Sequence, residues 1–252
     1  MATVFELSEP YCNHLIAVLP PGRGVCGVCW TATNPDFRLC YKCNAARNEF
    51  RDRLADTVVP IALAVKREQL AHELWHYKYD VDQSVRARLT MRLAAVLWRF
   101  LGEHEDHIAQ AIDMPGFDIV TTVPGTRERD EEHPLETVVG KIVGQTMSRF
   151  EPLVTLREGI AAPPHTLAAD RYRATHGLRG DPAVLLIDDT WTSGANAQSA
   201  ALALREAGAA KVAIIVIGRH FDRSFQNCEA YYLQARRRKF TWDTCCLELG
   251  KE

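Results

Sequence analysis

The sequence predicts an α/β fold with a parallel sheet covered by helices, preceded by a small cysteine-rich module. Apolar segments of strand length alternate with segments of helical periodicity, which is typical of a parallel sheet buried on both faces. Five of the eight cysteines lie in the first 43 residues. This asymmetry predicts a module at residues 1–50 and a body at residues 51–252.

The composition indicates a soluble globular protein, with 47% hydrophobic and 25% charged residues. A net charge of -2 does not favour nucleic acid as the main partner. No apolar stretch approaches the ~20 residues of a membrane span, and the acidic start MATVFELSEPYC lacks a secretory signal. We therefore expect a cytoplasmic protein without a membrane partner, whose cysteines are metal ligands or free thiols.

The first half of the body predicts two strands and two helices. Strands are expected at Val58–Val65 and at Phe117–Val123. Pro60 marks the first of them as an edge strand or as the entry of a strand. Helices are expected at Arg67–Tyr77 and, with clear apolar periodicity, at Ser84–Leu101.

The second half continues the alternation. Helices are expected at Pro134–Met147, where proline suits the first helical position, and at Gly194–Ala207. Strands are expected at Pro152–Leu156, Val184–Asp188 and Lys211–Gly218.

The segment Val184–Asn196, VLLIDDTWTSGAN, carries the clearest functional pattern. A buried strand delivers Asp188 and Asp189 to the carboxyl end of the sheet, where α/β proteins bind ligands. Small hydroxyl residues and Gly194 then lead into a helix whose free amides favour a phosphate. The pattern indicates a site for a sugar carrying a phosphate. The alternative is an ordinary connection in which Asp and Thr cap the helix.

This segment resembles the phosphoribosyl pyrophosphate (PRPP) loop of type I phosphoribosyltransferases, and the resemblance implies that fold, PRPP as ligand and Mg²⁺ as its companion. It implies catalytic roles for Asp188 and Asp189 on the ribose. Thr190 and Trp191 replace aliphatic residues, and Trp191 is expected to reshape the acceptor side. The implied PRPP-binding residues of this segment are Asp188, Asp189, Thr190, Thr192, Ser193, Gly194, Ala195 and Asn196.

The resemblance also implies roles for two further segments, a loop that cradles the diphosphate and a lid. Gly125 and Thr126 offer a free backbone and a hydroxyl, and Arg127 offers a bidentate cation that would assist the leaving group. A solvated surface loop is the alternative. Arg157–Arg179 lies where these transferases keep a flexible lid, and a disordered connector is the alternative.

Four cysteines form two Cys-x-x-Cys pairs, Cys26/Cys29 and Cys40/Cys43, separated by a ten-residue spacer with Asn34-Pro35-Asp36 at its middle. Four thiolates complete the tetrahedral shell that zinc prefers, so we expect a structural zinc ribbon. A pair of redox-active dithiols is the alternative. Cys12 and His14 are expected to be bystanders.

A zinc ribbon ahead of such a body resembles the ComF family, which is linked in bacteria to competence and DNA uptake. LWHYKYD (Leu74–Asp80) and DIVTTVPGTRER (Asp118–Arg129) are similar to segments of that family. The chain departs from the family after Arg129, where Asp130–Leu135 replaces its usual Arg-Gly-Phe-Asn.

Other signals are weaker. Arg236–Lys239, followed by Phe240 and Trp242, is either a nucleic-acid contact or a solvated face. His104 and His107 are read as a solvated helix end rather than a metal site, and Cys245-Cys246 as packing.

Two hypotheses of function remain. The first is a phosphoribosyltransferase that moves the phosphoribosyl group to or from a nitrogen acceptor of the nucleobase type. The second is an adaptor that senses PRPP or takes part in DNA uptake and catalyses nothing.

Overall fold

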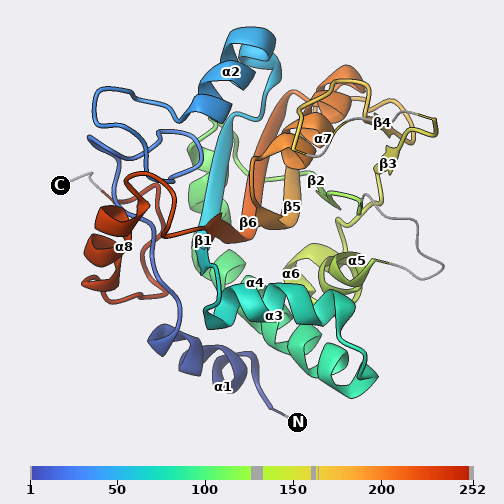
Figure 1. Cartoon of the computed structure of the whole chain (residues 1–252). Coiled ribbons are helices and arrows are strands. Elements are labelled where there is room, and N and C mark those ends of the chain that lie inside the picture. Colours follow the sequence, from blue (N-terminus) through green and yellow to red (C-terminus); the bar gives the residue numbers. More distant parts are fainter. Residues whose placement is uncertain (1, 126–132, 160–162, 164, 250–252) are drawn as a thin grey trace.

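The computed structural model describes residues 2–125, 133–159, 163 and 165–249. Its main sheet is fully parallel, in the order β1 (Thr57–Val65), β6 (Lys211–Phe221), β5 (Ala183–Trp191) and β2 (Ile119–Thr122) (Figure 1). The strands are apolar almost throughout because both faces of the sheet are buried. The α/β fold and the edge position of β1 are therefore confirmed.

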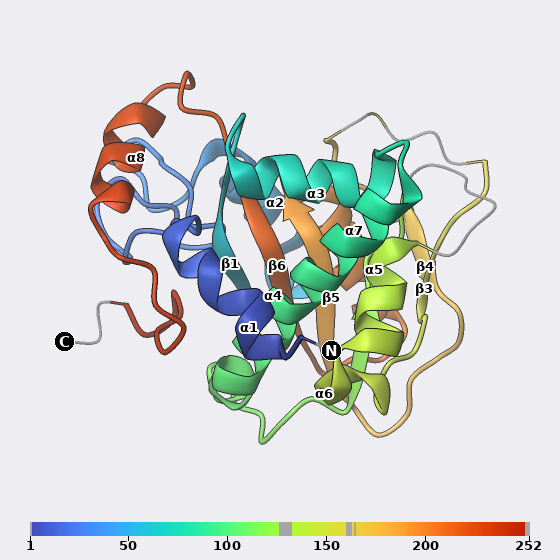
Figure 2. The same cartoon turned by 90° about the horizontal axis from the view of Figure 1, so that it is seen from below.

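Helices cover both faces of the sheet (Figures 1 and 2). One face carries α3 (Gln69–Tyr79) and α4 (Gln83–Gln110), and then α5 (Pro134–Thr137), a π turn at Val138–Ile142 and α6 (Gly144–Met147). The other face carries α7 (Ala195–Glu206). Two apolar clusters form the core, each containing side chains from one face of β5 and β6.

The remaining elements surround this body. They are α1 (Val4–Ser8), a 3₁₀ turn at Glu9–Asn13, α2 (Tyr41–Phe50), a 3₁₀ turn at Arg51–Arg53, the antiparallel pair β3 (Val154–Leu156) and β4 (Tyr172–Ala174), and α8 (Cys228–Arg236). The N-terminal segment joins the core beside β1, where the Leu63 amide donates to the Ile16 carbonyl at 2.8 Å. The boundary predicted at residue 50 falls at the end of α2 and stays a prediction.

Several elements differ from their predictions. The single helix predicted at Pro134–Met147 is broken at Val143, whose backbone is extended between the π turn and α6. The helix predicted to end at Leu101 continues to Gln110 and buries Ile108. The strands predicted to end at Asp188 and Gly218 continue to Trp191 and Phe221.

Candidate functional site

The predicted ligand segment lies at the carboxyl end of a central strand. β5 ends at Trp191, and the β5–α7 loop (Thr192–Gly194) leads directly into α7. Gly194 caps this helix in the left-handed conformation, with φ 79°. The first amides of a twelve-residue helix therefore open at the edge of the sheet, where a negative charge is favoured.

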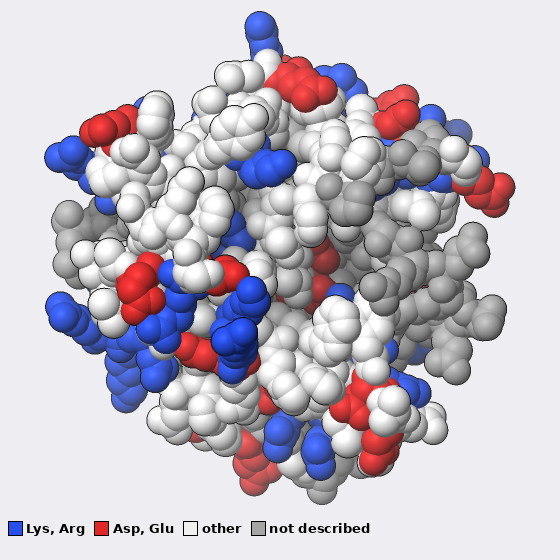
Figure 3. All heavy atoms as spheres, in the orientation of Figure 1, with Lys and Arg blue, Asp and Glu red and all other residues white. Residues whose placement is uncertain are grey.

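A cavity of about 230 Å³ opens at this edge. Figure 3 shows a hollow near the centre of the corresponding face, with acidic side chains at depth. The described residues that line the cavity include nine predicted for the ligand: Gly125, Asp188, Asp189, Thr190, Thr192, Ser193, Gly194, Ala195 and Asn196. Thr126 and Arg127 lie outside the described residues. The structure thus gathers residues from two separate loops around one cavity, and their roles stay predictions.

The two aspartates have different surroundings. Asp189 is only 3% exposed, accepts a hydrogen bond from the Tyr77 hydroxyl and pairs with the Lys78 ammonium. Although burial opposes ionisation, Lys78 and Tyr77 hold the pKa of Asp189 below its usual range. Asp189 is therefore an anion already held in place by two side chains of α3.

Asp188 is half-buried and accepts a hydrogen bond from the Asp189 amide at 2.9 Å. Burial, and then the charge of Asp189, raise the pKa of Asp188 to about 7, against the opposing effect of Lys78. One aspartate is thus firmly ionised, while the other exchanges its proton near neutral pH. Such a divided pair is common where two carboxylates share a site.

Tyr77 and Lys78 belong to the site although the sequence pattern that contains them assigns a role to neither. Both come from α3, which packs on β1 and β6 and brings its last turns to the acidic pair. Only the tertiary contact shows that these residues hold Asp189.

Trp191 lies beneath the β5–α7 loop rather than in the cavity. Its side chain is 2% exposed, and its ring fills the space where a Cβ of residue 194 would stand. Trp191 lines a neighbouring cavity of about 510 Å³ that shares Ser193, Gly194 and Ala195 with this one, so its effect on the acceptor side stays a prediction. The ring also supports the turn and requires glycine at position 194.

The segment predicted as a lid, Arg157–Arg179, follows β3 and contains β4, and these two strands pair antiparallel. Arg171, 6% exposed, donates to the Pro163 and Thr166 carbonyls and to Asn196 Oδ1. His165 lines the cavity. Arg171 therefore links the described part of this segment to the start of α7, next to the proposed phosphate position.

Arg219 is a buried residue that sequence reasoning missed. From β6 its guanidinium donates to the Trp191, Thr192 and Cys29 carbonyls at 2.9, 3.1 and 3.1 Å. The same side chain thus holds the β5–α7 loop and the cysteine module. A cation inside the apolar run VAIIVIGRH was the available signal.

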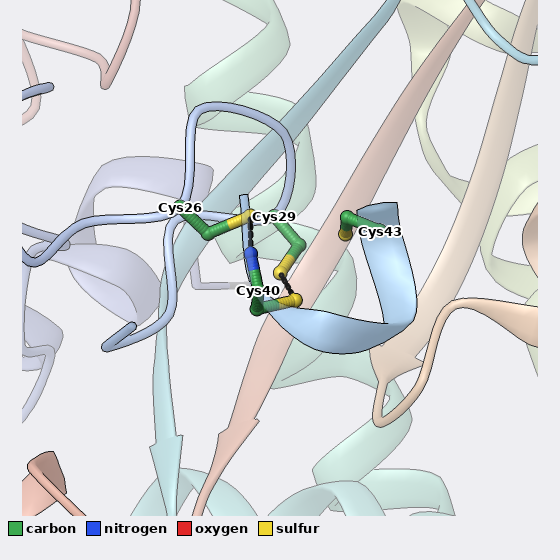
Figure 4. A group of neighbouring side chains, drawn as sticks. All are labelled: Cys26, Cys29, Cys40 and Cys43. Carbon is green, nitrogen blue, oxygen red and sulfur yellow. Dashed lines mark hydrogen bonds between the residues drawn. The ribbon is translucent and has the colours of Figure 1, made fainter. Parts of the chain in front are cut away.

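The predicted metal ligands come together. The sulfurs of Cys26, Cys29, Cys40 and Cys43, the four-cysteine site, all lie within 4.8 Å of one another (Figure 4). Cys29 and Cys40 are 3.7 Å apart, close to the roughly 3.8 Å edge of a tetrahedron with zinc–sulfur bonds of about 2.3 Å. The Cys40 amide donates to Cys26 Sγ at 3.3 Å. These donors fit a structural metal such as zinc.

Local folding explains this arrangement. An isolated bridge between Val25 and Ala32 closes the turn that presents Cys26 and Cys29, and a turn at Asn34–Phe37 reverses the spacer. The second pair opens α2, with Cys40 at its N-cap. Cys12 and His14 do not belong to the cluster, as expected.

The weaker sequence signals are resolved in part. Arg236–Lys239 lies at the end of α8, where Figure 3 shows Lys and Arg side chains gathered. Phe240 and Trp242 are buried, so they are not available to stack on bases. The reading of His104 as solvated is wrong, because this residue is 2% exposed.

No helix within the described ranges has the length and apolar character needed to cross a bilayer.

No family model matches the chain, and no curated protein matches it. Among solved structures, one described as the allosteric regulatory enzyme of purine biosynthesis is similar at 13% identity and a TM-score of 0.35. The match covers 71% of this chain and 45% of that chain. At this TM-score the similarity does not support an assignment of function.

Proposed function

We propose that the chain binds PRPP together with Mg²⁺ at the end of β5 and transfers the phosphoribosyl group to or from a nitrogen acceptor of the nucleobase class. The observation that supports this proposal is the cavity itself. It brings an acidic pair, small hydroxyl residues and the N-terminus of α7 within reach of one small ligand. This combination suits a sugar that carries a phosphate at one end.

The start of α7 would hold the 5′-phosphate. Its amides and its dipole favour the dianion, and the hydroxyls of Thr192 and Ser193 line the same cavity. Arg171 donates a hydrogen bond to Asn196 Oδ1 and so orients this side chain. The amide nitrogen of Asn196 then points away from Arg171, where it can donate to a phosphate oxygen. Arg171 would thereby help to place the phosphate.

The acidic pair would hold the ribose hydroxyls. The transfer proceeds through positive charge at the anomeric carbon, and the anionic Asp189 favours that charge electrostatically. Asp188 lines the cavity with a carboxylate, a hard oxygen donor of the kind that suits Mg²⁺. Bound with the ligand, Mg²⁺ supplies charge neutralisation at the diphosphate. Arg127 is proposed to assist the leaving group.

A PRPP-binding protein without turnover is the second candidate. One observation favours it: Lys78 is the only lysine or arginine among the described residues that line the cavity, and it pairs with Asp189. The departure from the ComF pattern at Asp130–Leu135 points the same way. Membership of that family, with its link to competence, stays a proposal that rests on the sequence resemblance.

Calorimetric titration with PRPP and Mg²⁺ tests the binding shared by both candidates. Asp188→Asn and Asp189→Asn should each weaken binding at least tenfold, because a charge-assisted hydrogen bond contributes about 1.5–3 kcal/mol. Asp181→Asn is the matched control, since this exposed residue precedes β5 at the opposite end of the strand. Equal affinity in all four proteins contradicts both candidates. Pyrophosphate release with a panel of nucleobases then separates them, because only the transferase releases it.

The affinity for PRPP and Mg²⁺ is expected to rise with pH. Since the pKa of Asp188 is raised to about 7, this carboxyl is mostly protonated at pH 6 and accepts ribose hydroxyls poorly. Affinity at pH 6 should be about tenfold weaker than at pH 8, in proportion to the ionised fraction. Asp188→Asn is the control: it has no carboxyl at this position, so any pH dependence left in its affinity comes from the ligand's own phosphates. An identical pH profile in this variant would contradict the assignment to Asp188.

A further inference from the structure

A second group of metal-ligand side chains lies where the C-terminal segment meets α4. His104 comes from the last turns of this helix, and Cys245 and Glu248 come from the segment after α8. His104 and Cys245 are 2% and 3% exposed, and Glu248 is half-buried. One donor atom from each residue lies within 4.8 Å of the other two.

The His104 ring is held as metal-bound imidazoles are held. Its Nε2 lies 2.8 Å from the Trp242 carbonyl oxygen. A carbonyl oxygen only accepts, so Nε2 carries the proton and donates. Most histidines that bind metals donate their other ring nitrogen in this way, often to a backbone carbonyl. His104 Nδ1 is left facing the Glu248 carboxylate at 3.5 Å.

The Glu248 carboxylate is oriented by groups around it. The Cys245 amide donates to its Oε2 at 2.7 Å, and His107 Nδ1 lies 3.2 Å from its Oε1. These contacts turn one carboxylate oxygen toward His104 and fix the turn that carries Cys245. Nitrogen, sulfur and oxygen donors therefore converge from two segments that lie far apart in the sequence.

We propose that His104, Cys245 and Glu248 bind a zinc ion, independently of the four-cysteine site. One nitrogen, one thiolate and one carboxylate form a mixed donor set that zinc accepts. Metal–ligand bonds of about 2.0–2.3 Å place tetrahedral ligand atoms roughly 3.3–3.8 Å apart. The 3.5 Å between His104 Nδ1 and Glu248 Oε2 falls in this range. Three protein ligands leave the fourth position to a water molecule.

The ion would fasten the C-terminal segment to α4. The other reading of the same contacts is a metal-free ion pair between an imidazolium and Glu248. The two readings differ in metal stoichiometry. With zinc at both sites the chain holds two ions, whereas the ion pair leaves one at the four-cysteine site.

The test measures zinc per chain after the full-length protein is loaded with Zn²⁺ alone and passed through a desalting column. Wild type is expected to retain two equivalents, and Cys245→Ser and Glu248→Gln one each. Cys246→Ser is the matched control, because this buried neighbour lies outside the cluster, and it should retain two. His107→Gln should keep the site but weaken its zinc affinity about 10- to 100-fold, as loss of an outer contact does.

Visible absorption gives a second measurement that does not depend on counting zinc ions. Cobalt added to protein that already carries one zinc should show the bands of a tetrahedral ion with a thiolate ligand in wild type and in Cys246→Ser. Glu248→Gln should lack those bands; Glu248 is half-buried, so this variant serves if Cys245→Ser fails to fold. One zinc in folded wild type, or two in folded Glu248→Gln, overturns the proposal.

Discussion

Replacing Cys43 by serine is expected to release the metal of the four-cysteine site and to lower the free energy of unfolding by on the order of 4 kcal/mol or more, because loss of a structural metal is among the largest single-residue effects. The module has little core of its own, so the metal contributes directly to its folding. Cys26, Cys29 and Cys43 are buried in the same apolar cluster as α7, and the damage should spread to that face of the sheet.

Thermal unfolding followed by circular dichroism, with zinc content measured on the same samples, checks this expectation. All proteins must be compared at one zinc concentration, because a bound ion shifts the midpoint by mass action. Cys12→Ser is the matched control, since Cys12 lies in the same N-terminal region but outside the cluster. If Cys43→Ser binds as much zinc as Cys12→Ser, the four-cysteine site is not a metal site.

Gly194→Ala should lower the free energy of unfolding more than a glycine-to-alanine exchange at any other described glycine with positive φ. The new Cβ would overlap the buried Trp191 ring, and the residue would also have to keep φ 79°. Overpacking costs about 1–3 kcal/mol, and the left-handed conformation about 1–2 kcal/mol more. We expect a loss of about 2–5 kcal/mol in urea unfolding, together with weaker PRPP binding.

Gly180→Ala separates these two costs. Gly180 has φ 78°, and a Cβ there would meet nothing within 4 Å, so this variant carries only the backbone cost. The double variant Trp191→Ala/Gly194→Ala removes the overlapping ring and should be less destabilised than the sum of its single exchanges. Equal stability of Gly194→Ala and Gly180→Ala would show that the Trp191 ring does not constrain the loop.

Elements with strong local patterns were predictable. β5 and β6 each contain an unbroken apolar run, residues 183–187 and 212–217, which is typical of a parallel sheet covered on both faces. The four-cysteine site followed from spacing alone, since two Cys-x-x-Cys pairs have few other uses. The order of strand, loop and helix around DDTWTSGAN was predictable from the apolar run and Gly194, although the strand ends three residues later than predicted.

Features that depend on tertiary contact were not predictable. Tyr77 and Lys78 reach Asp189 only because α3 packs across β1 and β6, and no local pattern encodes that approach. Trp191 departs from the family pattern, but only the fold shows that its ring lies under Gly194. His104 sits among charged neighbours in the sequence and is buried by a much later segment of the chain, near Trp242.

Arg219 makes the cysteine module an integral part of the body rather than an exchangeable appendage. A chain that began after residue 50 would keep the Arg219 guanidinium but lose the Cys29 carbonyl, which accepts one of its hydrogen bonds. The buried cation would then lack one acceptor. The same guanidinium would still donate to the Trp191 and Thr192 carbonyls, so the missing contact would lie directly behind the β5–α7 loop. Grafting this module onto another α/β body would therefore require an arginine at the equivalent place in its sheet.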